Sequence, residues 1–200
     1  MTDDEVKAVK GCGEHKPIGT GDVECPAYDL GGKKRNVSFH FAEGKLHKIQ
    51  VWFAEAMPHA DAELATDELI AYLTRTHGEL ESHSLPAGTP VSRAALFTAL
   101  DALPAGQLSK VQLKPSKDPP GTVVFASVIR DPRHGYFVFL YYDSPGRGSK
   151  ADGRQTGRSR SRSVSGLPVR AALSDLCTTT CGATRPWAAR HSDSSVRPIH

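Results

Sequence analysis

Two pairs of cysteines are the residues whose type and spacing suggest covalent or metal chemistry. Cys12 and Cys25 bracket a stretch rich in glycine and proline. A disulfide between them would remove about 3 kcal/mol of entropy from the unfolded chain. We expect this disulfide in an oxidising compartment and two free thiols in the cytosol. Cys177 and Cys181 lack the spacing of a redox CxxC or a zinc knuckle, so we interpret them as incidental.

Sequence motifs for catalysis and for cofactor binding are missing. The chain contains no Gly-x-Ser-x-Gly elbow, no P-loop, no dinucleotide-binding glycine pattern and no HExxH pair. Several of its nine histidines, including His59, His77 and His134, fall in turns or at expected helix ends, where a solvated side chain is the usual case. We therefore predict a protein that is not an enzyme and that holds no cofactor and no metal.

An arginine–serine run near the C-terminus suggests a different chemistry. Arg158, Arg160 and Arg162 alternate with serines, and Arg154 precedes them. Arginines on a flexible segment neutralise phosphates, which gives salt-sensitive binding to RNA or DNA without sequence preference. The run lacks interleaved aromatic side chains on which bases could stack. Nucleic acid is therefore our alternative partner, and a protein or cell-envelope partner is the first.

The composition of the chain changes near residue 145. Residues 1–144 carry 15 Lys and Arg against 19 Asp and Glu, whereas residues 145–200 carry 10 against 3 and contain one aromatic residue, Trp187. A segment with so few large apolar side chains cannot offset its ordering entropy. We predict an irregular segment over 1–24, a domain over 25–144 and a disordered tail over 145–200. A frame-shifted or read-through end is an alternative origin of that tail.

A period-two pattern of apolar residues predicts a β-hairpin between residues 37 and 53. A three-residue loop, with Gly44 in the left-handed conformation, would pair Val37 with Ile49. That register gathers the apolar side chains on one face, whereas a two-residue loop would divide them between two faces. We therefore predict the three-residue loop. The gathered residues are Val37, Phe39, Phe41, Ile49, Val51 and Phe53.

Helical periodicity follows the hairpin. Pro58 and Asp61 mark the start of a helix that Gly78 ends, with Asp61 as the candidate cap. Ser92 is expected to cap a second helix that ends at Pro104. The first helix carries a buried stripe at helical spacing, which consists of Ala65, Leu69, Tyr72, Leu73 and Thr76.

Further strands complete the predicted domain. Strand patterns cover residues 79–85, 108–114, 122–130 and 136–143. The last two are apolar at nearly every position, which is typical of strands covered on both faces. We predict an α+β fold, with an antiparallel sheet of about five strands and two helices on one face.

The hairpin leaves Trp52 on the face opposite its apolar set, where a partner must meet it or another segment must cover it. We group it with Tyr28, Phe137 and Tyr141 as a candidate contact face for a protein or envelope partner, or for a second copy in a homodimer. Core packing is the alternative for Phe137 and Tyr141. No run of about 20 apolar residues is present, so we expect no membrane span.

The hairpin Val37–Phe53, with its F-x-x-G-x-L-x-x-I pattern, and the helix end at His77 and Gly78 resemble a recurrent bacterial arrangement. It occurs in small, mostly uncharacterised secreted or lipoprotein-like α+β proteins, and the resemblance covers residues 30–80. It implies a fold and an envelope location, and it brings no catalytic residue. No apolar signal region precedes Cys12. We expect an extracytoplasmic location if the natural chain starts upstream, and a cytoplasmic one otherwise.

Overall fold

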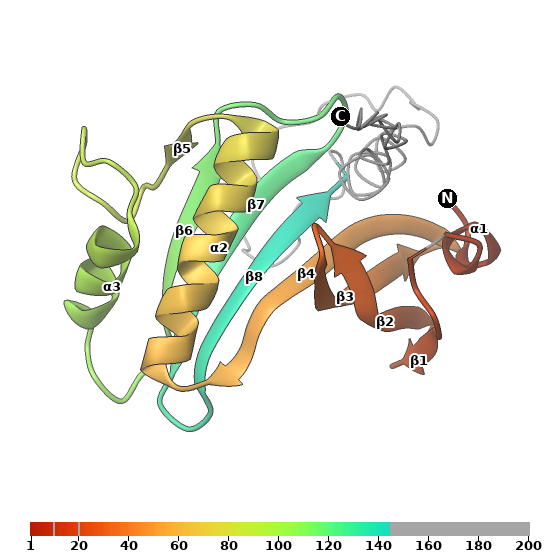
Figure 1. Ribbon diagram of the computed structural model, residues 1–200, viewed down its shortest axis with the longest axis horizontal. Helices are drawn as coiled ribbons and strands as arrows, with labels where there is room; N and C mark the ends of the chain where they lie inside the picture. The colour runs from red at the N-terminus through yellow and green to blue at the C-terminus, as the bar shows by residue number, and fades with distance from the viewer. Residues whose placement is uncertain (10, 20, 145–200) are drawn as a thin grey trace, which may run out of the picture.

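An eight-stranded antiparallel sheet organises the chain (Figure 1). The computed structural model describes residues 1–9, 11–19 and 21–144. An α+β fold with an antiparallel sheet is confirmed, but the expected number of about five strands is wrong. In spatial order the strands are β1 (Lys16–Ile18), β2 (Asp22–Leu30), β3 (Lys33–Ala42), β4 (Lys45–Met57), β8 (Gly135–Asp143), β7 (Val123–Asp131), β6 (Ser109–Pro115) and β5 (Leu80–Glu81).

Two of the three helices in the described residues pack on one face of this sheet. Helix α2 (His59–His77) crosses in front of the sheet and α3 (Arg93–Asp101) lies beside β6 (Figure 1). Helix α2 contacts β4 and β8, and α3 contacts β6 and β7. The first residue of α2 follows Pro58, and Asp61 does not cap the helix. Ser92 caps α3 as expected, because its Oγ accepts a hydrogen bond from the Ala95 amide at 3.2 Å. The predicted stripe of α2 faces the core, where Ala65, Leu69, Tyr72 and Leu73 are buried.

The first 24 residues are not irregular, as the sequence suggested, but belong to the fold. They contain α1 (Asp3–Lys7), β1 and the beginning of β2. Thr2 and Glu5 form a capping box at the start of α1. Val6 is fully buried in the core, and the Leu46 amide on β4 donates to the Met1 carbonyl at 2.7 Å. The domain therefore begins well before residue 25.

A β-bulge explains why sequence periodicity did not reveal β2. Pro26 and Ala27 lie where the register between β2 and β3 shifts, so two residues of β2 oppose one of β3. Proline cannot donate to a strand ladder, and a bulge is one of the few places in a sheet that tolerates it. Beyond the bulge the inward positions change from odd to even numbers, so no simple alternation remains. The inward residues are Val23, Cys25, Tyr28 and Leu30.

The turn between β3 and β4 differs from the predicted three-residue loop. It has two residues, Glu43 and Gly44, with φ of 52° and 69°. This is the conformation of a tight hairpin turn. This turn alone would pair Val37 with Gln50, but one further residue in β4 shifts the register, so Val37 pairs with Val51 and not with Ile49. A second bulge at His47 inserts one residue into β4, which restores the common face of the apolar residues.

The predicted disordered tail, residues 145–200, lies outside the residues that the structure describes. None of the helices in the described part of the chain is long and apolar enough to cross a bilayer.

Candidate interaction face

Strand alternation sends the side chains of β8 to opposite faces of the sheet. The even-numbered residues from Val138 to Tyr142 are fully buried beneath α2, where the Tyr142 hydroxyl is 3.2 Å from that of Tyr72. The odd-numbered residues from Phe137 to Tyr141 point to the other face. No helix of the described residues covers that face.

Neighbouring strands add two rings to this set. Trp52 on β4 lies opposite Phe139, and Phe125 on β7 lies opposite Tyr141. Directly opposed residues of an antiparallel pair share a face, so all of these rings lie on the same side. We define the aromatic face by five side chains, which are Trp52, Phe125, Phe137, Phe139 and Tyr141.

The rings of the aromatic face contact one another and are not coplanar. The Trp52 centroid lies 5.2 Å from that of Phe139 and 6.2 Å from that of Phe137, with interplanar angles of 74° and 63°. Tyr141 lies 4.8 Å from both Phe139 and Phe125, at 66° and 37°. Edge-to-face pairs of this kind add about 0.5–1.5 kcal/mol beyond area burial. The rings therefore form a continuous apolar layer without a flat stacking surface.

Lys48 lies against one end of this layer. Its Nζ is 3.9 Å from the centroid of the Tyr141 ring, a cation–π geometry. Burial lowers the pKa of Lys48, and the carboxylate of Asp143 opposes that shift. Burial also raises the pKa of Tyr141 to about 12, so its hydroxyl stays protonated at neutral pH.

Opposite charges border the aromatic face on its two sides. On β6, Lys110 and Lys114 are exposed on this side of the sheet, and we call this row of β6 the basic edge. Glu81 on β5 lies directly opposite Lys114 at the margin of the sheet. On β2, Asp22 contacts His40 Nδ1 at 2.8 Å, and Glu24 accepts a hydrogen bond from the Asn36 amide at 2.7 Å. We call this row of β2 the acidic edge, and Lys16 on β1 lies directly opposite Glu24 at the other margin of the sheet. The apolar centre of the face therefore lies between an acidic row on β2 and a basic row on β6, and each row has one residue of opposite charge beyond it.

The structure brings together three of the four residues predicted as a contact face. Trp52, Phe137 and Tyr141 are half-buried members of the aromatic face, and Phe139 between them is 5% exposed. Tyr28 is not a member, because its side chain lies on the other side of the sheet and packs in the core. The bulge in β2 turns it inward. Sequence reasoning missed Phe125 and Phe139, although both lie in the apolar runs that were expected to be covered on two faces.

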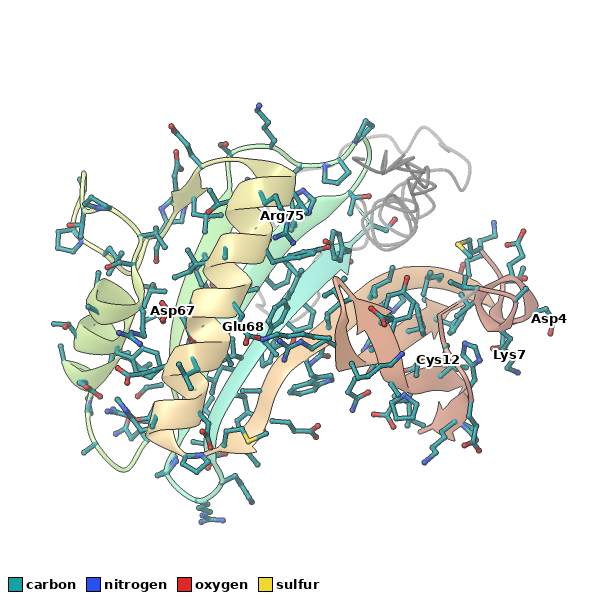
Figure 2. All side chains as sticks on the ribbon, viewed as in Figure 1. Asp4, Lys7, Cys12, Asp67, Glu68 and Arg75 are labelled. Carbon is teal, nitrogen blue, oxygen red and sulfur yellow. A yellow bond between two sulfur atoms is a disulfide. The ribbon has the colours of Figure 1, made fainter. Side chains whose placement is uncertain are left out.

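Cys12 and Cys25, the pair that their spacing singled out, form a disulfide with their Cα atoms 5.7 Å apart. The bond ties the segment after α1 to β2, where Cys25 is fully buried. Figure 2 shows Cys12 near α1 at the β1–β2 end of the sheet. The other predicted residues of this kind lie outside the described part of the chain: Arg154, Arg158, Arg160, Arg162, Cys177 and Cys181.

A buried polar cluster beneath α2 includes a histidine that the sequence placed in solvent. His77 is 4% exposed, and its Nε2 lies 3.1 Å from the Tyr142 hydroxyl. Buried polar atoms require such partners, so the cluster fastens the end of α2 to β8. Among the residues that the structure describes, no group of three or more His, Cys, Asp or Glu side chains is placed to hold a metal ion.

Comparison with protein families, curated proteins and solved structures found no match to this chain.

Proposed function

We propose that the protein is a non-catalytic binding module that contacts a macromolecular partner through its aromatic face. The observation that supports this most is the layer of five aromatic rings on the side of the sheet opposite α2 and α3. Four of the five rings are half-buried and reach the surface around the buried Phe139, and contiguous apolar surface of this kind is typical of binding sites. Tryptophan, tyrosine and phenylalanine are the residues most enriched at protein interfaces.

The proposal includes an oxidising compartment, such as the bacterial cell envelope. The disulfide between Cys12 and Cys25 supports this part, because such bonds persist outside the reducing cytosol. The resemblance of residues 30–80 to secreted and lipoprotein-like proteins points the same way.

Site-specific photo-crosslinking in cells tests the proposal. A photoreactive amino acid replaces Phe125 or Phe137 on the aromatic face, and Leu64 on α2 in the control, since Leu64 is 60% exposed on the helix side. We expect the same discrete adduct from both face positions and none from position 64. Equal labelling at all three positions, or labelling at position 64 alone, would contradict the proposal.

A further inference from the structure

We propose that the occupant of the aromatic face is a second copy of this chain, related by a two-fold axis that runs parallel to the strands between β4 and β8. The inference rests on the proposed function, because it names the partner of the same face. It follows from three features of the described residues: the ring geometry, the order of the strands and the positions of the charges.

The geometry of the rings favours a protein partner over a nucleobase. Bases stack on flat, accessible ring faces. Here the Lys48 ammonium occupies one face of Tyr141, and Trp52 meets Phe139 at 74°. Such a corrugated layer suits the interdigitating side chains of a second sheet, as in a β-sandwich.

The strand order is symmetric in number about the boundary between β4 and β8, where a two-fold axis can lie. On either side of the line between β4 and β8 lie four strands, in the order β1-β2-β3-β4 and β8-β7-β6-β5. Rotation about an axis along this line places β4 over β8 of the second copy, β3 over β7 and β2 over β6. The acidic edge of each copy then meets the basic edge of the other.

Individual charges also meet under this rotation, because it preserves position along the strands. Glu24 lies in the same cross-strand row as Phe125, and Lys114 on β6 directly follows the partner of Ala126. Glu24 of one copy therefore faces Lys114 of the other. By the same rule Lys48 faces Asp143 of the second copy, since the two residues pair across β4 and β8 within the chain.

Sheet twist and charge together select this axis. A twisted sheet has the shape of a saddle, and rotation about an axis parallel to its central strands produces a complementary saddle. An axis across the strands would also match the shapes, but it would place β6 over β6. Lys110 and Lys114 would then meet lysines, and like charges across an interface are strongly unfavourable. Only the axis along the strands pairs opposite charges.

Charge reversal in the full-length chain tests the inference. Lys114→Glu and Glu24→Lys each create like-charge contacts at two symmetric places, and the double variant restores opposite charges. Lys114 is 54% exposed, and its partners within the chain are Asp118, at 4.0 Å, and Glu81 across the strand pair. Surface pairs of this kind contribute at most about 1 kcal/mol, so the reversal should not unfold the protein, and rescue by the double variant separates the interface effect from these local contacts. Lys117→Glu, in the exposed loop beside the end of α2, is the control with the same change of net charge.

Sedimentation equilibrium over about a hundredfold range of concentration measures the dimer dissociation constant. We expect each single reversal to raise this constant at least about tenfold, and the double variant to return it toward wild type. Lys117→Glu should leave it unchanged. A wild-type chain that stays monomeric throughout would overturn the inference. So would a dimer that the reversals do not weaken, or a double variant that is not rescued.

These outcomes separate the inference from the proposed function. If the chain is monomeric but positions 125 and 137 still give a discrete adduct, with a mass other than that of a dimer, the proposed contact face stands. The inference that its occupant is a second copy is then wrong. If the chain forms neither a dimer nor an adduct, both the proposed function and the inference of a second copy are wrong.

Discussion

Trp52 on β4 lies opposite Phe139 on β8, and the two ring centroids are 5.2 Å apart on the face away from the helices. These two strands join the N-terminal half of the sheet, β1 to β4, to the C-terminal half, β8 to β5. The Trp52–Phe139 contact therefore lies at the middle of the sheet and at the centre of the aromatic face. Interface residues in such central positions are the ones that dominate binding energies.

Trp52 should contribute less to folding stability than a ring on the core face. We predict that Trp52→Ala lowers the free energy of unfolding by about 1–2 kcal/mol, mainly through lost edge contacts with Phe137 and Phe139. Phe39→Ala is the comparison, because Phe39 is 1% exposed in the core. It should cost about 3–5 kcal/mol. Urea unfolding of dilute full-length protein measures both values. A Trp52→Ala loss as large as that of Phe39→Ala would place Trp52 in the core.

The helices and the central strands follow local rules, which is why sequence patterns found them. The stripe of α2 and the cap of α3 are set by residues within a few positions of one another. The strands β7 and β8 likewise come from unbroken apolar runs. Hydrophobic periodicity, a capping side chain and a terminating glycine or proline were therefore enough to predict these elements.

Periodic patterns could not predict the two β-bulges, and these bulges account for errors in both the predicted fold and the predicted contact face. Pro26 and Ala27 broke the alternation of β2, so the strand went unseen and Tyr28 was assigned to the wrong face. At His47 a bulge combined with a two-residue turn gave the same face pattern as the expected loop. Parity alone cannot distinguish these two solutions, because each places the apolar residues together. The edge charges of the candidate site also depend on strand order, which periodicity does not specify.

Gly135 should be among the least replaceable glycines of the described residues. Its φ is +90°, and an added Cβ would lie 2.6 Å from the Met57 carbonyl oxygen, a rigid backbone atom. Gly32 has a similar φ of +83° with open space around it, so Gly32→Ala carries only the strain of a left-handed backbone, about 1–2 kcal/mol. We predict that Gly135→Ala costs at least about 1 kcal/mol more than Gly32→Ala. Equal melting temperatures for the two variants would show that β4 yields at Met57 without cost.

Glu68 should make stability depend on pH in the acidic range. Burial raises the pKa of its carboxyl, but hydrogen bonds from Lys33 and Arg35 and the charge of Arg35 outweigh this, and the net pKa lies below the usual 4.5. Figure 2 shows Glu68 on α2, on the side away from Asp67, which pairs with Arg93 at the start of α3. A lowered folded-state pKa stabilises the fold above the unfolded pKa, and this contribution disappears as the pH falls through the folded value.

We therefore predict that Glu68→Gln is less stable than wild type at neutral pH and that the difference shrinks below about pH 4.5. Denaturant unfolding at a series of pH values measures the two curves. If the free energy of unfolding falls in parallel for wild type and variant as the pH drops below about 4.5, Glu68 does not have this role.

The Cys12–Cys25 disulfide should stabilise the fold mainly by restricting the unfolded chain. It closes a loop with a sequence separation of 13. Removing it with Cys12→Ser and Cys25→Ala should lower the free energy of unfolding by about 3 kcal/mol and leave the far-ultraviolet circular dichroism unchanged. The control replaces Cys177 and Cys181 by serine and keeps the Cys12–Cys25 pair. We expect its free energy of unfolding to equal that of the wild type. If the 12/25 variant loses its β-sheet spectrum, the bond is required for the fold itself.

The nucleic-acid alternative predicts a different signal. Replacing Arg154, Arg158, Arg160 and Arg162 by glutamine would remove four phosphate contacts. The salt dependence of single-stranded RNA binding should then become shallower by roughly 0.7 per lost contact. Binding by the intact chain that falls steeply with salt, and that the four substitutions abolish, would move this function to first place. The absence of binding by the intact chain would exclude it.

The most direct measurement is the solvent accessibility of Trp52 as a function of protein concentration. Trp187→Phe leaves Trp52 as the only tryptophan in the full-length chain. Its emission and its quenching by acrylamide are recorded while sedimentation reports the oligomeric state. If the aromatic face binds a second copy, Trp52 emission shifts to the blue and quenching falls as the dimer forms. If quenching is the same in monomer and dimer, the interface lies elsewhere and the account is wrong.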